Sequence, residues 1–141
     1  MLPVGRPWHR HLAEVLGAAR QSVVVSAPYV SAYGTEFLMQ HTEPLVRSSG
    51  AITLVTDLSP ANVAQGATEA SAILELFRAC TSFRLIHLAH LHAKVYVADD
   101  SEAIVSSGNL TRGGLVSNFE YSVHLSGTEE VGQVRQDVLD Y

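Results

Sequence analysis

The sequence contains a single cysteine, a single lysine and no apolar stretch long enough to cross a lipid bilayer. Cys80 has no partner for an internal disulfide, and its place in the helical pattern ILELFRAC indicates a core thiol without a catalytic role. Glu14 and Arg20 interrupt any signal-type apolar region near the N-terminus, so we expect a cytoplasmic protein. These features argue against a disulfide-stabilised secreted domain and against a protein that spans a membrane.

Positive charge is also scarce in this chain. Nine cationic residues are set against fourteen acidic ones, which gives a formal net charge of −5 at pH 7. General nucleic-acid binders are usually basic, so any contact with DNA must be confined to a local part of the surface. The single lysine, Lys94, stands two residues after His92 in an apolar stretch, a position that argues against a purely solvated side chain.

Helical and strand patterns alternate along the 141 residues, a length that suits one domain with its own hydrophobic core. We expect a single α/β domain over residues 1–141, with a mixed β-sheet flanked by helices on both faces. The β-branched run SVVVSAP indicates a central strand buried on both faces. The patterns predict strands at 22–28, 51–57, 83–88, 92–98, 103–107 and 119–125, and helices at 8–20, 33–49, 60–66, 68–80 and after 128.

Two of these helices carry finer predictions. Pro44 should end or kink the second helix, because proline lacks a backbone N–H and disfavours helix at the residue before it. In the helix at 68–80, the apolar positions recur at helical spacing. Its buried stripe is therefore predicted to contain Ala72, Ile73, Leu76 and Phe77.

The stretch from residue 88 to residue 121 holds the polar residues with chemical potential. Side chains alternate along a strand, so His92 and Lys94 of HAKVYVAD point to the same face. The polar residues 99–102 then predict a hairpin with a loop of about four residues. We expect Ala98 to pair with Ala103 across this loop.

That register would set Lys94 opposite Ser107 and His92 opposite Asn109, so that four polar side chains converge on one patch. A neutral imidazole can attack phosphorus, and an ammonium group can bind a phosphate oxygen. Serine and asparagine can donate hydrogen bonds to the remaining oxygens. The sequence therefore predicts a phosphate-sized site that needs no metal and no cofactor.

Other histidines could suggest a metal site, which we reject. His87, His90 and His92 lie close in sequence, but strand alternation and a loop-like segment make it improbable that all three share one face. His9 and His11 lack a third ligand nearby, so we expect them to be solvated at the start of the first helix.

The spacing H-x-K-x4-D-x6-S-S-x-N resembles the HKD motif of the phospholipase D superfamily, in which Gly usually stands at the position of Ser106. The later residues Asn118-Phe119-Glu120 resemble the single-motif nuclease branch of that superfamily, and the resemblance extends over most of the chain. It rests on agreement in residue type and spacing at His92, Lys94, Asp99, Ser107 and Asn109.

This resemblance implies a PLD-like fold and a metal-independent phosphodiesterase, namely a nuclease domain of restriction or defence type that acts on DNA. The family's mechanism uses one histidine to form a phosphohistidine and a second to protonate the leaving oxygen. A chain with one such motif should therefore work as a homodimer. The lack of an apolar stretch that could cross a bilayer predicts no stable association with a membrane. Catalytic roles fall to His92, Lys94, Asn109 and Glu120, and phosphate binding to Lys94, Ser107 and Asn109.

Two acidic residues are assigned different roles within this motif. In the family the downstream acid, here Glu120, accepts a hydrogen bond from the nucleophilic histidine and so orients His92. Asp99 falls in the hairpin loop and is expected to stabilise that turn instead of contacting substrate.

Two alternatives stay open at this point. A phospholipase or transphosphatidylase would share the same site but should show an apolar lip, and a catalytically silent relative would use the domain only for binding and dimerisation. The sequence leaves open whether the substrate is DNA, RNA or lipid, and whether the domain is part of a longer protein.

Overall fold

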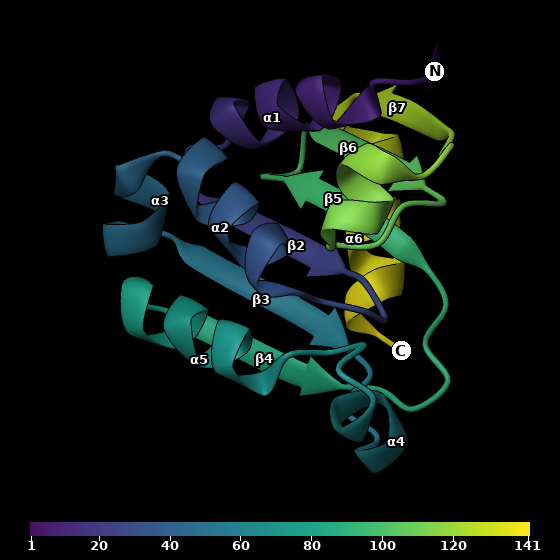
Figure 1. Ribbon diagram of the computed structural model, residues 1–141. Coiled ribbons are helices and arrows are strands. Elements are labelled where there is room, and N and C mark those ends of the chain that lie inside the picture. Colours follow the sequence, from purple (N-terminus) through teal and green to yellow (C-terminus); the bar gives the residue numbers. More distant parts are fainter.

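Seven strands form one mixed β-sheet in the computed structural model, which describes residues 1–141 (Figure 1). The order across the sheet is β1-β7-β6-β5-β2-β3-β4, in which β2, β3 and β4 are parallel and the other neighbouring pairs are antiparallel. The bounds are β1 Leu2–Val4, β2 Ser22–Ser26, β3 Ala51–Thr56, β4 Phe83–His87, β5 Lys94–Ala98, β6 Glu102–Ser106 and β7 Ser122–Ser126.

Helices cover both faces of this sheet, as predicted. Helices α1, α2 and α5 bury apolar side chains in the larger core cluster on one face, and α6 packs against the opposite face (Figure 1). None of the helices combines the length and apolar character that crossing a membrane requires. Their bounds are α1 Trp8–Ala18, α2 Ala32–His41, α3 Pro44–Ser49, α4 Pro60–Ala64, α5 Ala70–Ala79 and α6 Thr128–Leu139, with a π-helical turn η1 at Gly113–Ser117.

The valines of β2 explain why this strand lies inside the sheet. Val23 and Val25 belong to the larger core cluster, whereas Val24 belongs to the smaller one beneath α6. The strand therefore buries both faces between β5 and β3, which confirms the prediction from SVVVSAP. The break at Pro44 is also confirmed, because α2 ends at His41 and α3 begins at Pro44.

The register predicted for the β5–β6 hairpin is wrong by one residue. Ala98 pairs with Glu102 and Lys94 with Ser106, so Lys94 does not lie opposite Ser107, nor does that register set His92 opposite Asn109. The loop is shorter than predicted because Asp99 adopts a left-handed conformation, with φ of 55°, and turns the chain back sooner.

One prediction about burial is wrong, and one strand was not predicted. Ala72, Ile73 and Leu76 are buried as expected, but Phe77 is 61% exposed. Its ring contacts the ring of Phe83 in the edge strand β4, with centroids 6.4 Å apart. The short strand β1 was not predicted, because three residues that include a proline carry too little periodicity to be recognised.

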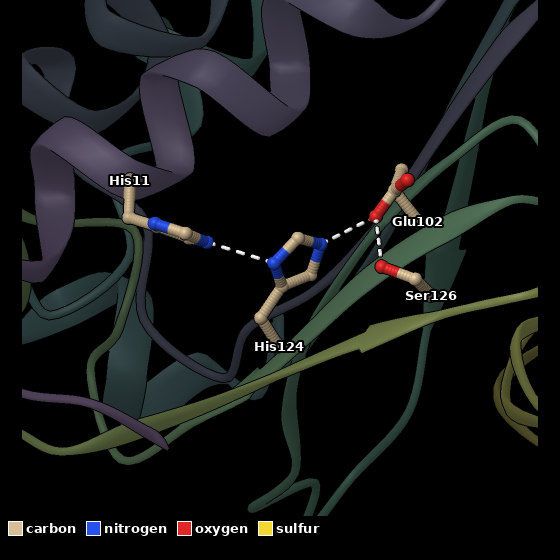
Figure 2. Close-up of polar contacts among 4 residues, drawn as sticks. All are labelled: His11, Glu102, His124 and Ser126. Atoms are coloured by element: carbon tan, nitrogen blue, oxygen red, sulfur yellow. Dashed lines mark hydrogen bonds and ion pairs between the residues drawn. The ribbon is translucent and has the colours of Figure 1, made fainter. Parts of the chain in front are cut away.

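A chain of polar contacts joins α1 to β7 and β6, as Figure 2 shows. The Nε2 atom of His11 lies 2.8 Å from Nδ1 of His124, whose other ring nitrogen pairs with the carboxylate of Glu102. Ser126 donates a hydrogen bond of 2.8 Å to the same carboxylate. The expectation that His11 is merely solvated is therefore wrong. The sequence pattern did not reveal the contact because the two histidines are 113 residues apart.

Asp99 links the β5–β6 hairpin to the segment between α1 and β2. Its carboxylate accepts hydrogen bonds from the backbone N–H groups of Arg20 at 3.0 Å, Gln21 at 2.8 Å and Ser22 at 2.9 Å. Partial burial acts to raise the pKa of Asp99, but these three donors together lower it below its usual value. The charged carboxylate therefore stabilises the folded chain.

We predict that Asp99→Asn lowers the free energy of unfolding by about 1–3 kcal/mol at neutral pH, because an amide replaces a charged acceptor of three N–H donors. A lowered folded-state pKa contributes stability above the unfolded pKa of about 3.9, and this contribution is lost as the pH falls through the folded value. The difference from wild type should thus shrink below about pH 4. Urea denaturation across this pH range measures it.

The matched control is Asp100→Asn, at the neighbouring exposed carboxylate. It should leave stability within about 0.5 kcal/mol of wild type. Equal effects of the two substitutions at neutral pH would show that the Asp99 contacts do not stabilise the fold.

Candidate active site

Three strands bring polar residues to one end of the sheet. Lys94 begins β5, Ser106 ends β6 and Ser122 begins β7, and these residues are aligned as neighbours across the three strands. The C-terminal end of β2 lies at the same end, where Ser26 donates a hydrogen bond of 2.9 Å to the Ala93 carbonyl. Connections after β2, β3, β4 and β6 therefore surround the start of β5.

His92 and Lys94 are in direct contact at this end. The Nζ atom of Lys94 lies 3.2 Å from Nδ1 and 3.3 Å from Nε2 of His92. His92 is exposed just before β5, whereas Lys94 is only 7% exposed. Burial lowers the pKa of Lys94, and the negative charge of Glu120 partly counters this effect. The pair places an exposed imidazole beside a cation with little access to water.

Ser107 and Glu120 form a second polar pair beside Lys94. The Ser107 hydroxyl hydrogen-bonds to one carboxylate oxygen of Glu120 and accepts a hydrogen bond of 3.0 Å from the Tyr121 N–H. The other Glu120 oxygen accepts a hydrogen bond of 3.2 Å from Asn118. The predicted hydrogen bond from His92 to Glu120 is therefore not formed, because Glu120 precedes β7 and lies beside the residue that follows β6.

Asn109 and the residues before it form a tightly packed turn. Its Oδ1 atom accepts a hydrogen bond of 3.3 Å from the Tyr29 N–H after β2. A side chain at Gly108 would lie 2.5 Å from both the Gly114 carbonyl oxygen and the indole of Trp8. The Trp8 indole N–H donates to the same carbonyl at 2.9 Å, so only glycine fits at residue 108.

Ser106 stands where the related motif usually has glycine. Its hydroxyl oxygen accepts hydrogen bonds of 2.9 Å from the Gly108 N–H and 2.8 Å from the Ser122 hydroxyl. The extra side chain is thus accommodated inside the turn and lies between β6 and β7.

Asp57, at the end of β3, was missed in the sequence. It is 8% exposed, and its carboxylate accepts hydrogen bonds from the Ser59 hydroxyl, the Ser59 N–H at 2.9 Å and the His90 N–H at 3.2 Å. The Ser59 hydrogen bonds are the main reason why the pKa of Asp57 is lowered. The sequence signal was Asp57-Leu58-Ser59, the pattern of an aspartate that bonds to the backbone two residues on.

Asp57 also holds the loop that leads to His92. His90 takes a left-handed conformation with φ of 66°, and the Nδ1 atom of His87 accepts a hydrogen bond of 2.9 Å from the Leu58 N–H. These contacts fix the segment between β4 and β5. No group of three or more His, Cys, Asp or Glu side chains is arranged to hold a metal ion.

The site as a whole brings together His92, Lys94, Ser107 and Glu120, with Asn109 in the adjoining turn. Asp99 lies at the other end of β5, where it binds backbone N–H groups. The arrangement offers a nucleophile, a buried cation and hydroxyl and amide groups, which suits an anion with several oxygens.

Comparisons with known proteins agree with this fold. A family model described as "Cardiolipin synthase, PLD-like domain" matches residues 12–140. Among curated proteins, none matches the sequence.

Three solved structures share the fold over 99% of this chain. NucT from Helicobacter pylori has 15% sequence identity, a TM-score of 0.74 and 92% of its own chain covered. Nuc from Salmonella typhimurium, a phospholipase D family member, has 16% identity, a TM-score of 0.72 and 91% coverage. TrmBL2, an archaeal chromatin protein that binds DNA, has 12% identity, a TM-score of 0.66 and 51% coverage. At these identities the likeness concerns the fold.

Proposed function

Because the chain belongs to the family of PLD-like domains, we propose that it is a metal-independent phosphodiesterase with His92 as the nucleophile. The observation that carries this proposal is the contact of 3.2 Å between exposed His92 and the buried Lys94 ammonium. A buried cation beside an exposed imidazole attracts a phosphate and directs it toward the nucleophile.

The proposed reaction has two steps. A ring nitrogen of His92 attacks phosphorus, the bond from phosphorus to the leaving oxygen breaks, and a second histidine protonates that oxygen. Water then attacks the phosphohistidine while the second histidine takes a proton from it, which releases a phosphate monoester and regenerates His92. Lys94 and Asn109 bind the non-bridging oxygens, and the Ser107 hydroxyl joins them when its proton turns from the Glu120 carboxylate to the phosphate.

We propose nucleic acid, and DNA in particular, as the substrate of a nuclease of restriction or defence type. Arg112 follows Asn109 by three residues and adds a cation next to the phosphate site, although the chain as a whole is acidic. One structural neighbour, TrmBL2, is a DNA-binding protein. The description of the matching family favours a second candidate, a phospholipase or transphosphatidylase.

The second histidine is best supplied by another copy of the chain, so we propose a homodimer with a two-fold axis near His92. Two large aromatic side chains support an interface at this end. Phe119 is 87% exposed and Tyr121 is 60% exposed on either side of Glu120. Aromatic residues are enriched in the cores of protein interfaces, which supports a contact between two copies at this end.

We predict that His92→Ala lowers phosphodiester cleavage about a thousandfold or more, since it removes the group that forms the covalent intermediate. Lys94→Ala should come close to this loss. Cleavage of plasmid, single-stranded DNA, RNA, phosphatidylcholine and bis(p-nitrophenyl) phosphate should be measured in excess EDTA, in which wild-type activity persists.

The control is His90→Asn, which removes a neighbouring exposed imidazole and keeps a residue that tolerates the left-handed backbone. It should retain most of the activity. Residual activity of His92→Ala within about tenfold of wild type, or a wild-type activity lost in EDTA and restored by Mg²⁺, would refute the proposal.

A second prediction concerns assembly. Sedimentation velocity at micromolar concentration should show a dimer, and Phe119→Asp should shift it toward monomer with a parallel loss of activity. The control Leu74→Asp alters an exposed apolar residue of α5 outside the proposed interface and should leave the dimer intact. An active monomer whose rate is first order in protein would contradict a shared site.

A further inference from the structure

An exposed arginine–tyrosine pair lies next to the turn at Asn109, after β6. Tyr33, in the first turn of α2, is 39% exposed, and the Cζ atom of Arg112 lies 5.9 Å from the centroid of its ring. Tyr29, which follows β2, is 42% exposed. Two tyrosines from one short segment and an arginine far from them in the sequence therefore adjoin one turn.

The backbone holds these residues beside Asn109. A Cβ atom at Gly34 would lie 1.9 Å from the Leu110 carbonyl oxygen, so only glycine lets the first turn of α2 approach the residue after Asn109 so closely. The Ser31 N–H donates a hydrogen bond of 3.0 Å to the same carbonyl. The Tyr29 N–H in turn donates to the Asn109 side chain at 3.3 Å.

The Tyr33–Arg112 pair contributes little to holding the fold together. Its separation of 5.9 Å is at the outer limit of about 6 Å for a cation–π contact, and both groups are open to water. The pair formed by Arg6 and Phe119 is closer, at 4.4 Å. Because Tyr33 is 39% exposed, its ring has surface that a ligand can contact. The neighbouring guanidinium group of Arg112 can bind a phosphate or stack on a base.

We infer that Tyr33 and Arg112, together with Tyr29, bind an unpaired nucleobase next to the phosphate held by Lys94, so that the preferred substrate is single-stranded nucleic acid. This inference rests on the proposed function. Aromatic rings and arginine stack on the flat faces of unpaired bases, whereas the faces of bases inside a duplex are already covered by their neighbours.

The test is binding of a fluorescein-labelled oligothymidylate of about twenty nucleotides, followed by anisotropy in the His92→Ala background, where the probe is not cleaved. Tyr33→Ala should raise the Kd about tenfold, and Tyr33→Phe, which keeps the ring, should stay within about twofold of the background protein. Arg112→Glu should weaken binding of the same probe, and binding of a duplex of equal length should change little with Tyr33→Ala.

Two controls separate this inference from the proposed function. Phe77→Ala removes an exposed aromatic ring of α5 and should leave binding unchanged. With His92 intact, Tyr33→Ala should slow the cleavage of oligothymidylate more than the cleavage of bis(p-nitrophenyl) phosphate, which carries no nucleobase. A wild-type protein that cleaves no diester would refute the proposed function, yet the binding result would still stand.

Several outcomes would overturn the inference itself. One is an unchanged Kd for Tyr33→Ala, and another is an equal loss with single-stranded and duplex probes. A third is that the His92→Ala protein, without further substitutions, binds no oligothymidylate at micromolar concentration. If Tyr33→Ala instead weakened binding to phosphatidylglycerol vesicles and left oligothymidylate binding unaffected, Tyr33 would belong to a lipid-binding surface.

Discussion

Burial of one positive charge at the start of β5 is the constraint on which the site depends. Lys94 is 7% exposed, and the loss of water around its ammonium group lowers its pKa. The ammonium group contacts the His92 ring, which carries no negative charge. The Glu120 carboxylate is hydrogen-bonded to Ser107 and Asn118 instead. A buried ammonium is costly unless an opposite charge pairs with it, and a phosphate oxygen meets that requirement.

The packing around the motif explains how this charge is held in place. Trp8 of α1 fills the space beside Gly108 and bonds to the Gly114 carbonyl, so the helix closes over the turn after β6. Farther along α1, His11 forms a hydrogen bond with His124, which fixes the same helix to β7. The loop before His92 is held by Asp57, whose carboxylate accepts a hydrogen bond from the His90 N–H. His92 and Lys94 therefore lie between parts of the chain that are each fastened to the sheet.

Local pattern was enough to predict every strand except β1, most helices and the shared location of His92 and Lys94, because alternation and periodicity act over a few residues. It failed where contacts between distant segments decide the outcome. The backbone N–H groups of residues 20–22 bind the Asp99 carboxylate and fix the turn at Asp99. The hairpin loop is therefore one residue shorter than the sequence predicts. Likewise, the partner of Glu120 depends on how β7 lies beside β6, which spacing to His92 alone cannot reveal.

The most direct test of the account is to trap the covalent intermediate. Wild-type protein should be mixed with bis(p-nitrophenyl) phosphate, quenched with acid-free denaturant during turnover, digested, and examined by mass spectrometry. The account predicts a p-nitrophenylphosphoryl group on His92, formed with release of one p-nitrophenolate and absent from the His92→Ala variant. Turnover without any adduct, or an adduct on another residue such as Ser107, would contradict it.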